Sequence, residues 1–345
     1  MKVISVFNQK GGVGKTTTVV NLSVALTYLD KKVLVIDMDP QANTTSGFGL
    51  DKFTIENSIY DLFCDLTEKK TMVANGEDGE KLSVDMAEEE IIQSNIEEIK
   101  EDGVKKENKE ETDSEDQNSN GKDPKADSTK EDEIEKIDGK NDLKEFMDID
   151  KYISKTEIGV DIITSQPALS GIEVELVDLD PFERTQELKE IMEEVRKKLY
   201  DYVIIDCPPS LGLLSINALV ASDSILAPVQ TEYYALEGIS ELMNTFNLVK
   251  NQLNKDLEIE GVLLTMFDKR TFLSYEVVEE VKNFFKSKVF KVMIPRTPRL
   301  AESPSHGLST IQYDPDSQGA LAYMMLADEI IKKRNGEYKW LIEEV

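Results

Sequence analysis

The stretch Lys10-Gly11-Gly12-Val13-Gly14-Lys15-Thr16-Thr17 constrains the fold of this chain more than any other part of its sequence. A mostly apolar, β-branched run precedes it (residues 3–7), and apolar residues at helical spacing follow it over residues 20–29. Glycines leave room for backbone N–H groups to point at phosphate oxygens, and the N-terminus of a following helix favours an anion. This order of strand, glycine turn and helix therefore predicts a phosphate-binding loop, with Lys15 at the β/γ-phosphates and the Thr16 hydroxyl on Mg²⁺. The alternative is a chance glycine run beside a solvated lysine.

The front of this loop departs from the usual pattern. Gln9 stands where the common form has its first glycine, and Lys10 adds a second lysine. In this respect the loop resembles the variant phosphate-binding loop of the ParA/MinD group of dimeric ATPases. The resemblance implies that Lys10 reaches across a dimer interface to the partner's phosphates and acts with Lys15 in catalysis. It assigns the whole loop to nucleotide binding: Lys10, Gly11, Gly12, Val13, Gly14, Lys15, Thr16 and Thr17.

Two apolar runs end in aspartates, which predicts buried parallel strands that deliver carboxylates to the edge where ligands bind. The first run, residues 33–36, leads into Asp37-Met38-Asp39-Pro40-Gln41, and the second, residues 202–205, leads into Asp206. The Asp-x-Asp-Pro-Gln pattern resembles that of the ParA group, which implies that Asp39 helps to activate the attacking water. The alternative for Asp39 is a turn-initiating Asp-Pro pair. Asp206 is expected near Mg²⁺, through a water.

The later strands favour ATP over GTP. No Asn-Lys-x-Asp motif, which reads guanine in GTPases, follows the strand predicted over residues 259–266. Segments 230–238 and 295–307 resemble the corresponding segments of the ParA group, in which the Pro-Arg portion packs beside the adenine. The resemblance thus assigns Met266, Pro295 and Arg296 to nucleotide binding. A further strand is predicted over residues 289–294, and helices over 58–66 and 188–199, the latter with Leu199 facing inward.

The fold expected is α/β, a mostly parallel central sheet flanked by helices, as in P-loop NTPases of the variant-loop type. Residues 1–70 and 147–336 are predicted to form one ATPase domain, interrupted by an acidic insertion at 71–146 and followed by a short acidic tail at 337–345. Residues 75–145 contain 26 acidic and 11 basic residues and no Phe, Tyr or Trp. Such a segment cannot bury enough apolar surface to offset its ordering entropy, so it is predicted to be mostly disordered. Apolar residues on one face of 88–100 suggest a transient or partner-bound helix there.

The charge of −28 over 345 residues argues against nucleic-acid binding unless a local basic patch exists. Residues 262–299 carry eight basic and four acidic side chains and supply such a patch. Arg270 and Arg299 match positions with which relatives of the ParA group contact phosphate, so they are the expected DNA-binding residues. The alternative is an ordinary solvated face.

The resemblance is closest to ParA/Soj partition ATPases without an N-terminal DNA-binding domain, and it covers about three quarters of the chain. It implies ATP and Mg²⁺ as cofactors, an ATP-sandwiched homodimer, non-specific DNA binding, and weak hydrolysis that a ParB-like partner stimulates. Plasmid or chromosome segregation would be the outcome. The first strand begins next to Met1 and no apolar run could span a bilayer, so a cytoplasmic, nucleoid-associated protein without a membrane partner is expected.

Three alternatives remain open at this point. A MinD-like division-site ATPase would need membrane attachment, against which the acidic C-terminus argues. A metabolic ligase of the same superfamily would need a small-molecule pocket, and a non-enzymatic scaffold would use ATP only to dimerise.

Overall fold

The computed structural model describes residues 1–76, 148–177, 179–233 and 235–337. Backbone contacts divide the chain into two units, one made of Met1–Met72 with Phe146–Val345 and the other of Val73–Glu145. Of the second unit only the end of helix α3 (Ile59–Gly76) is described. The predicted disorder of the insertion, the helix predicted at 88–100 and the tail beyond residue 337 lie outside the described residues.

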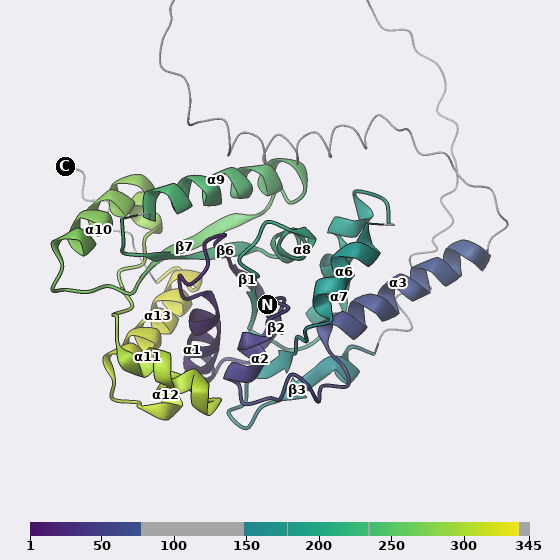
Figure 1. Ribbon diagram of the computed structural model, residues 1–345, viewed down its shortest axis with the longest axis horizontal. Helices are drawn as coiled ribbons and strands as arrows, with labels where there is room; N and C mark the ends of the chain where they lie inside the picture. Colours follow the sequence, from purple (N-terminus) through teal and green to yellow (C-terminus); the bar gives the residue numbers. More distant parts are fainter. Residues whose placement is uncertain (77–147, 178, 234, 338–345) are drawn as a thin grey trace, which may run out of the picture. The chain divides into compact units, whose positions relative to one another are not determined.

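The first unit is built on a seven-stranded sheet in the order β3-β4-β2-β5-β1-β6-β7 (Figure 1). All neighbouring strands pair in parallel except the edge strand β3, which runs antiparallel to β4. The strands are β1 (Lys2–Val6), β2 (Val33–Asp37), β3 (Ile153–Lys155), β4 (Asp161–Ile163), β5 (Tyr202–Asp206), β6 (Ser224–Gln230) and β7 (Glu258–Thr265). The predicted mostly parallel sheet is confirmed.

Helices cover both faces of this sheet, because its central strands carry apolar side chains on both sides. One apolar core joins α3, α6 (Leu169–Leu176), α7 (Glu187–Arg196), α8 (Leu213–Val220), α9 (Ala235–Gln252) and α10 (Phe272–Phe285) to one face. The other core joins α1 (Lys15–Tyr28), α12 (Thr310–Tyr313) and α13 (Gln318–Arg334) to the opposite face. Figure 1 shows α9 on one side of β6 and β7 and the pair α1 and α13 on the other. Within the described part, no helix is both long enough and apolar enough to cross a membrane.

The strand register brings the candidate site together. Val6 at the end of β1 and Asp37 at the end of β2 are both paired with Asp206 at the end of β5. Because these strands are parallel and adjacent, the loop that follows β1 lies beside the two carboxylates, although the three segments are far apart in the sequence.

Two secondary-structure predictions were wrong in detail. Residues 289–294 run alongside β7, with the Phe290 N–H bonded to the Val262 carbonyl at 3.0 Å, but they form no regular strand. The reason is that the next two backbone N–H groups, of Lys291 and Val292, donate to the buried Glu329 carboxylate on α13 at 3.0 and 3.3 Å. Leu199 lies beyond the end of α7 and is 83% exposed, so it does not face inward.

Helix α3 is longer than predicted. It begins at Ile59 but continues to Gly76, ten residues past the predicted end at 66 and into the segment assigned to the insertion.

Candidate active site

The loop between β1 and α1 has an open backbone cradle. Gly12 and Gly14 adopt left-handed φ values of 75° and 92°, which favour glycine, and a Cβ at Gly11 or Gly12 would meet no atom within 4 Å. The N-cap of α1 is Gly14, which has no side chain that could accept from the N–H groups at the start of this helix. The loop therefore offers backbone donors and a helix N-terminus to an anion.

Lys15 is the buried cation of the loop. Its side chain is 7% exposed, and its ammonium donates to the Lys10 carbonyl at 3.1 Å. Burial lowers the pKa of Lys15, although Asp206 and Asp39 nearby favour the charged form. An anion that entered the loop would add a negative charge beside this desolvated ammonium and stabilise it.

Asp206 is completely buried and accepts two hydroxyl hydrogen bonds on the same oxygen. The Thr16 and Thr44 hydroxyls donate to Oδ2 at 2.8 and 2.6 Å, whereas Oδ1 has no hydrogen-bond partner. A buried carboxylate oxygen without a partner is costly, and it fits a site completed by a hydrated cation. Mg²⁺ prefers such oxygen ligands and keeps several waters and phosphate oxygens, so the residues present fit this ion. The described residues contain no cluster of three or more His, Cys, Asp or Glu side chains that could coordinate a metal ion without other ligands.

Asp37 lies next to Asp206 and carries no water-accessible surface. Its Oδ2 accepts from both the backbone N–H and the hydroxyl of Thr45, at 2.8 and 2.7 Å. Burial, with the neighbouring Asp206 carboxylate, raises the pKa of Asp37, and burial also raises that of Asp206. A cation at this edge would relieve the repulsion between the two carboxylates.

Asp39 lies at the same edge and is 7% exposed. The negative charge of Asp39 acts to raise the pKa of Lys15 and also that of Asp206. Oδ1 accepts the Gln41 N–H at 2.9 Å, and the Asp39 carbonyl accepts the Ser165 hydroxyl at 2.7 Å. Gln41 thus holds the carboxylate and Ser165 holds the backbone of Asp39, beside the lysine and the aspartate predicted to bind phosphate and Mg²⁺.

Lys10 is half-buried at the front of the loop. Its N–H donates to Asn8 Oδ1 at 2.9 Å, and Asn8 Nδ2 donates to the Pro228 carbonyl of β6 at 2.8 Å. Gln9 donates to the Thr245 hydroxyl on α9 at 2.6 Å. The segment before the glycines is therefore fastened to β6 and α9.

The residues predicted beside the adenine come together next to the loop. The Thr265 hydroxyl donates to the Val13 carbonyl at 2.8 Å, and Met266 follows with a left-handed φ of 53°. Phe267 forms a bridge with Pro295, and the Arg296 N–H donates to the Phe267 carbonyl at 3.0 Å. The end of β7 and the segment from Pro295 thus form one wall adjoining the phosphate-binding loop.

Arg270 and Arg299 lie outside this cluster, before α10 and in the short helix α11 (Pro298–Glu302). Both are exposed and both are paired with carboxylates. Arg270 donates to Asp268 at 2.7 and 2.9 Å, and Arg299 forms ion pairs with Glu302 and Asp314, each at 2.9 Å. The neighbouring arginine holds the pKa of Asp268 below its usual range.

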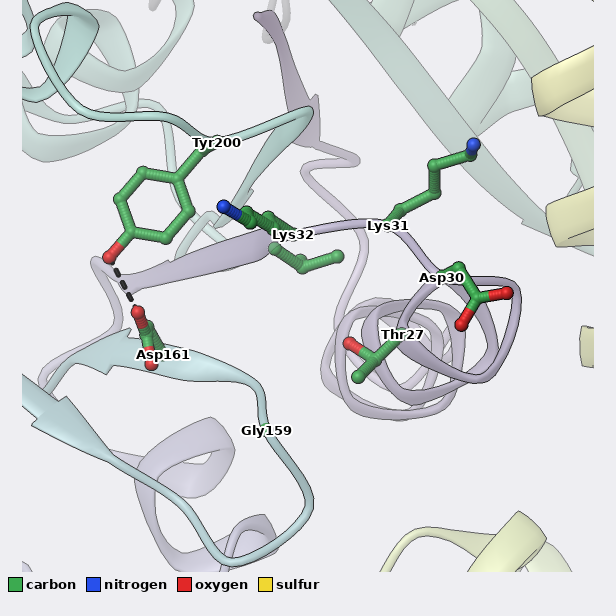
Figure 2. Close-up of a pocket in the computed structure, with 8 residues that line it drawn as sticks. Thr27, Asp30, Lys31, Lys32, Gly159, Asp161 and Tyr200 are labelled. Atoms are coloured by element: carbon green, nitrogen blue, oxygen red, sulfur yellow. Dashed lines mark hydrogen bonds between the residues drawn. The ribbon is translucent and has the colours of Figure 1, made fainter.

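A pocket of about 340 Å³ lies at the opposite, amino-terminal edge of the sheet (Figure 2). Lys31 and Lys32 before β2 line it with Asp161 at the start of β4, and Tyr200 donates to Asp161 at 2.6 Å. None of the predicted nucleotide-binding residues lines this pocket, so it is separate from the candidate site.

Sequence reasoning missed several side chains that shape the site. Thr44 shares the Asp206 oxygen with Thr16, and Gln9, Thr245 and Thr265 fasten the loop. The polar run after Asp39 was a signal that could have indicated Thr44. The contacts of Thr245 and Thr265 had no local signal.

A family model described as an AAA domain matches residues 1–114 and 121–259. The sporulation initiation inhibitor protein Soj of Bacillus subtilis is 41% identical over 329 residues, which cover 95% of this chain and 98% of Soj. The chromosome partitioning protein ParA of Myxococcus xanthus is 36% identical over 333 residues, covering 96% of this chain and 88% of the relative.

Solved structures with the same fold include cobyrinic acid a,c-diamide synthase from Mycobacterium smegmatis with bound ADP and magnesium. It is 24% identical, with a TM-score of 0.65, and the match covers 98% of this chain and 97% of that one. The cell division ATPase MinD of Pyrococcus furiosus is 21% identical, with a TM-score of 0.60 and coverages of 96% and 99%. At these identities the two structures establish the fold alone.

Proposed function

Because this chain belongs to the Soj/ParA family of chromosome-partitioning ATPases, we propose that it is an ATP-dependent partition ATPase whose ATP-bound dimer binds DNA without sequence preference. One observation carries the proposal. A phosphate-binding loop that begins with Lys10 lies at the same sheet edge as the buried side chains of Lys15 and Asp206. A ParB-like partner would stimulate hydrolysis, and release of DNA would drive segregation of a plasmid or chromosome.

Phosphate binding is the task of the loop. The backbone N–H groups of residues 11–17 and the ammonium of Lys15 hold the β- and γ-phosphates, while Met266, Pro295 and Arg296 border the adenine. Bound nucleotide would replace the Lys10 carbonyl as the partner of the Lys15 ammonium, which now donates to that carbonyl at 3.1 Å.

Magnesium would be held by the Thr16 hydroxyl and, through water, by Asp206. The ion supplies neutralisation of phosphate charge when bound. Thr16 now donates to Asp206 at 2.8 Å, and because its oxygen keeps lone pairs, the hydroxyl would ligate the ion while still donating to Asp206, which Thr44 also orients.

Hydrolysis requires positioning and charge neutralisation more than covalent work by the protein. Asp39 orients the attacking water from its place beside Lys15, with its carboxylate held by the Gln41 N–H and its backbone carbonyl by Ser165. Lys10 of the second subunit adds the positive charge that a single subunit lacks at the γ-phosphate. Turnover by the isolated protein would accordingly be weak.

DNA binding would use Arg270 and Arg299, both exposed in one subunit and doubled in a dimer. Each now pairs with carboxylates, and at an exposed surface such pairs are weak enough for DNA phosphates to displace them. Binding to DNA in the ATP state would place the protein in the cytoplasm, associated with the nucleoid, without a membrane partner.

The test is retardation of a DNA fragment by the full-length chain with ATP, ADP or no nucleotide, across a series of salt concentrations. Binding that requires ATP and weakens with salt is expected, because phosphate contacts release counterions. ATP-dependent co-sedimentation with anionic liposomes and no DNA binding would contradict the proposal and favour a MinD-like activity. Equal DNA binding in all three nucleotide states would also contradict it.

A further inference from the structure

Gln9 places a long polar side chain at a position of the loop that is ordinarily glycine. Its amide donates to the Thr245 hydroxyl at 2.6 Å, between residues 236 positions apart in the chain. A glycine there would have no side chain with which to make this contact. The front of this loop therefore has a connection to α9 that the common form of the loop lacks.

Thr245 lies in the buried face of α9. It is 3% exposed, and Leu242, Phe246 and Val249 of the same helix are also buried. A hydrogen bond in such surroundings is shielded from water, and losing one partner leaves a buried polar atom unsatisfied. Thr245 and Gln9 are thus held together more firmly than a solvent-exposed pair would be.

Lys10 follows directly and is positioned by this connection. Its N–H is bonded to Asn8 at 2.9 Å, and its carbonyl accepts the Lys15 ammonium at 3.1 Å. Asn8 is fastened to β6 and Gln9 to α9, so the backbone from which the Lys10 side chain starts is set by both elements.

We propose that Gln9 and Thr245 are a positioning pair that fixes the front of the phosphate-binding loop to α9, so that Lys10 is presented to a second copy of this chain. This rests on the proposed function, in which Lys10 completes the partner's site. The pair does not contact nucleotide in this scheme. The pair affects formation of the dimer, because a displaced Lys10 backbone would move the Lys10 ammonium away from the partner's site.

The experiment compares dimerisation with nucleotide binding by the monomer. Dimerisation of the full-length chain is measured by sedimentation equilibrium with the ATP analogue AMPPNP and Mg²⁺. Nucleotide binding is measured with a fluorescent ATP analogue at protein concentrations below dimerisation. Thr245→Val keeps the shape of the side chain and removes the hydroxyl, and Thr245→Ser keeps the hydroxyl.

Thr245→Val is expected to raise the dimer dissociation constant about tenfold, as the loss of one partly buried hydrogen bond predicts, and to leave monomer nucleotide affinity close to that of the wild type. Thr245→Ser should dimerise like the wild type. Gln9→Ala should weaken dimerisation as much as Thr245→Val, and the double variant no more than either. The matched control is Thr27→Val, which removes a hydroxyl bonded to Ser23 within α1 and should change neither constant.

Wild-type dimerisation by Thr245→Val, a parallel loss of nucleotide affinity, or additive effects in the double variant would overturn the positioning role. Lys10→Ala, measured in the same assays, distinguishes failure of the positioning role from failure of the proposed function. If Lys10→Ala dimerises like the wild type, the proposed function itself fails. If it loses the dimer while Thr245→Val keeps it, only the positioning pair is overturned.

Discussion

The Thr16 hydroxyl at the start of α1 donates a 2.8 Å hydrogen bond to Oδ2 of Asp206 at the end of β5. These residues are 190 positions apart, yet the parallel pairing of β1 with β5 brings them together. The bond links the phosphate-binding loop to the carboxylate expected to orient magnesium. The other carboxylate oxygen, Oδ1, is buried without a partner.

This arrangement predicts that Asp206→Asn lowers nucleotide affinity in the presence of Mg²⁺ but not in its absence. Loss of a carboxylate that holds the ion through water should lower Mg²⁺-dependent affinity about 10- to 100-fold. Binding in EDTA should change little. Titration of a fluorescent ATP analogue with and without Mg²⁺ measures both. Thr44→Ser, which keeps the second hydroxyl donor, is the matched control, and equal losses with and without Mg²⁺ would refute the assignment.

Lys10→Ala tests the donated charge. We expect nucleotide binding to persist, and ATP-dependent dimerisation and stimulated turnover to be lost, since a charge supplied in trans is worth about 10³-fold or more in phosphoryl transfer. Sedimentation and ATPase assays measure the two effects. Lys31→Ala, at the opposite edge of the sheet, is the control lysine. Wild-type turnover from a monomeric Lys10→Ala protein would show that Lys10 acts in another way.

The arginine pairs predict opposite effects of two neighbouring substitutions on DNA binding. Arg270→Ala should weaken binding and reduce the dependence of log affinity on log salt by about one for each phosphate that the variant no longer neutralises. Asp268→Asn should strengthen binding by about fivefold or less, because it removes a competing carboxylate from an exposed arginine. Retardation assays over several salt concentrations measure both. Arg196→Ala on α7 is the control, and an equal effect there would show that only net charge matters.

Glu260 predicts a pH-dependent contribution to stability. Burial alone would raise the pKa of this carboxyl, but Lys333 and Lys2, each 3.5 Å away, and the Ser224 hydroxyl outweigh burial and lower it. A carboxylate with a lowered folded-state pKa stabilises the protein above its unfolded pKa, and this stability is lost as the pH falls through the folded value.

Glu260→Gln should therefore reduce the free energy of unfolding at neutral pH by about 1–3 kcal/mol. The difference from the wild type should shrink below about pH 4. Urea unfolding at several pH values measures it. A difference that is constant from pH 7 to pH 3 would contradict the electrostatic origin, and Glu258→Gln, exposed on the same strand, is the control.

The assignment of residues 71–146 to an insertion predicts that the part of it beyond α3, residues 77–146, can be replaced by a short Gly-Ser linker. The chain on either side of this segment is tied together, since the Tyr152 hydroxyl donates to Asp65 and Lys151 lies 3.6 Å from the same carboxylate. Cooperative unfolding and unchanged nucleotide affinity are expected of the spliced chain, measured by circular dichroism and fluorescence. A chain that no longer folds would show that the replaced segment belongs to the domain.

The sequence was sufficient for the parallel sheet and for the convergence of the loop, Asp39 and Asp206, because the ends of parallel strands share one edge whatever their order. It was not sufficient for contacts made by single side chains across long separations. The contacts of Gln9 with Thr245 and of Thr44 with Asp206 leave no periodic pattern in the sequence from which they could be predicted. The strand predicted at 289–294 failed for the same reason, since the carboxylate that takes its N–H groups comes from α13.

The loop that would hold nucleotide is the first turn of the chain, yet its anchors are Pro228, Thr245 and Thr265. A nascent chain that has not yet released these residues from the ribosome lacks all three. The loop therefore gains all of these anchors only after Thr265 has left the ribosome. Synthesis of the loop thus precedes synthesis of the residues that hold it in its working geometry.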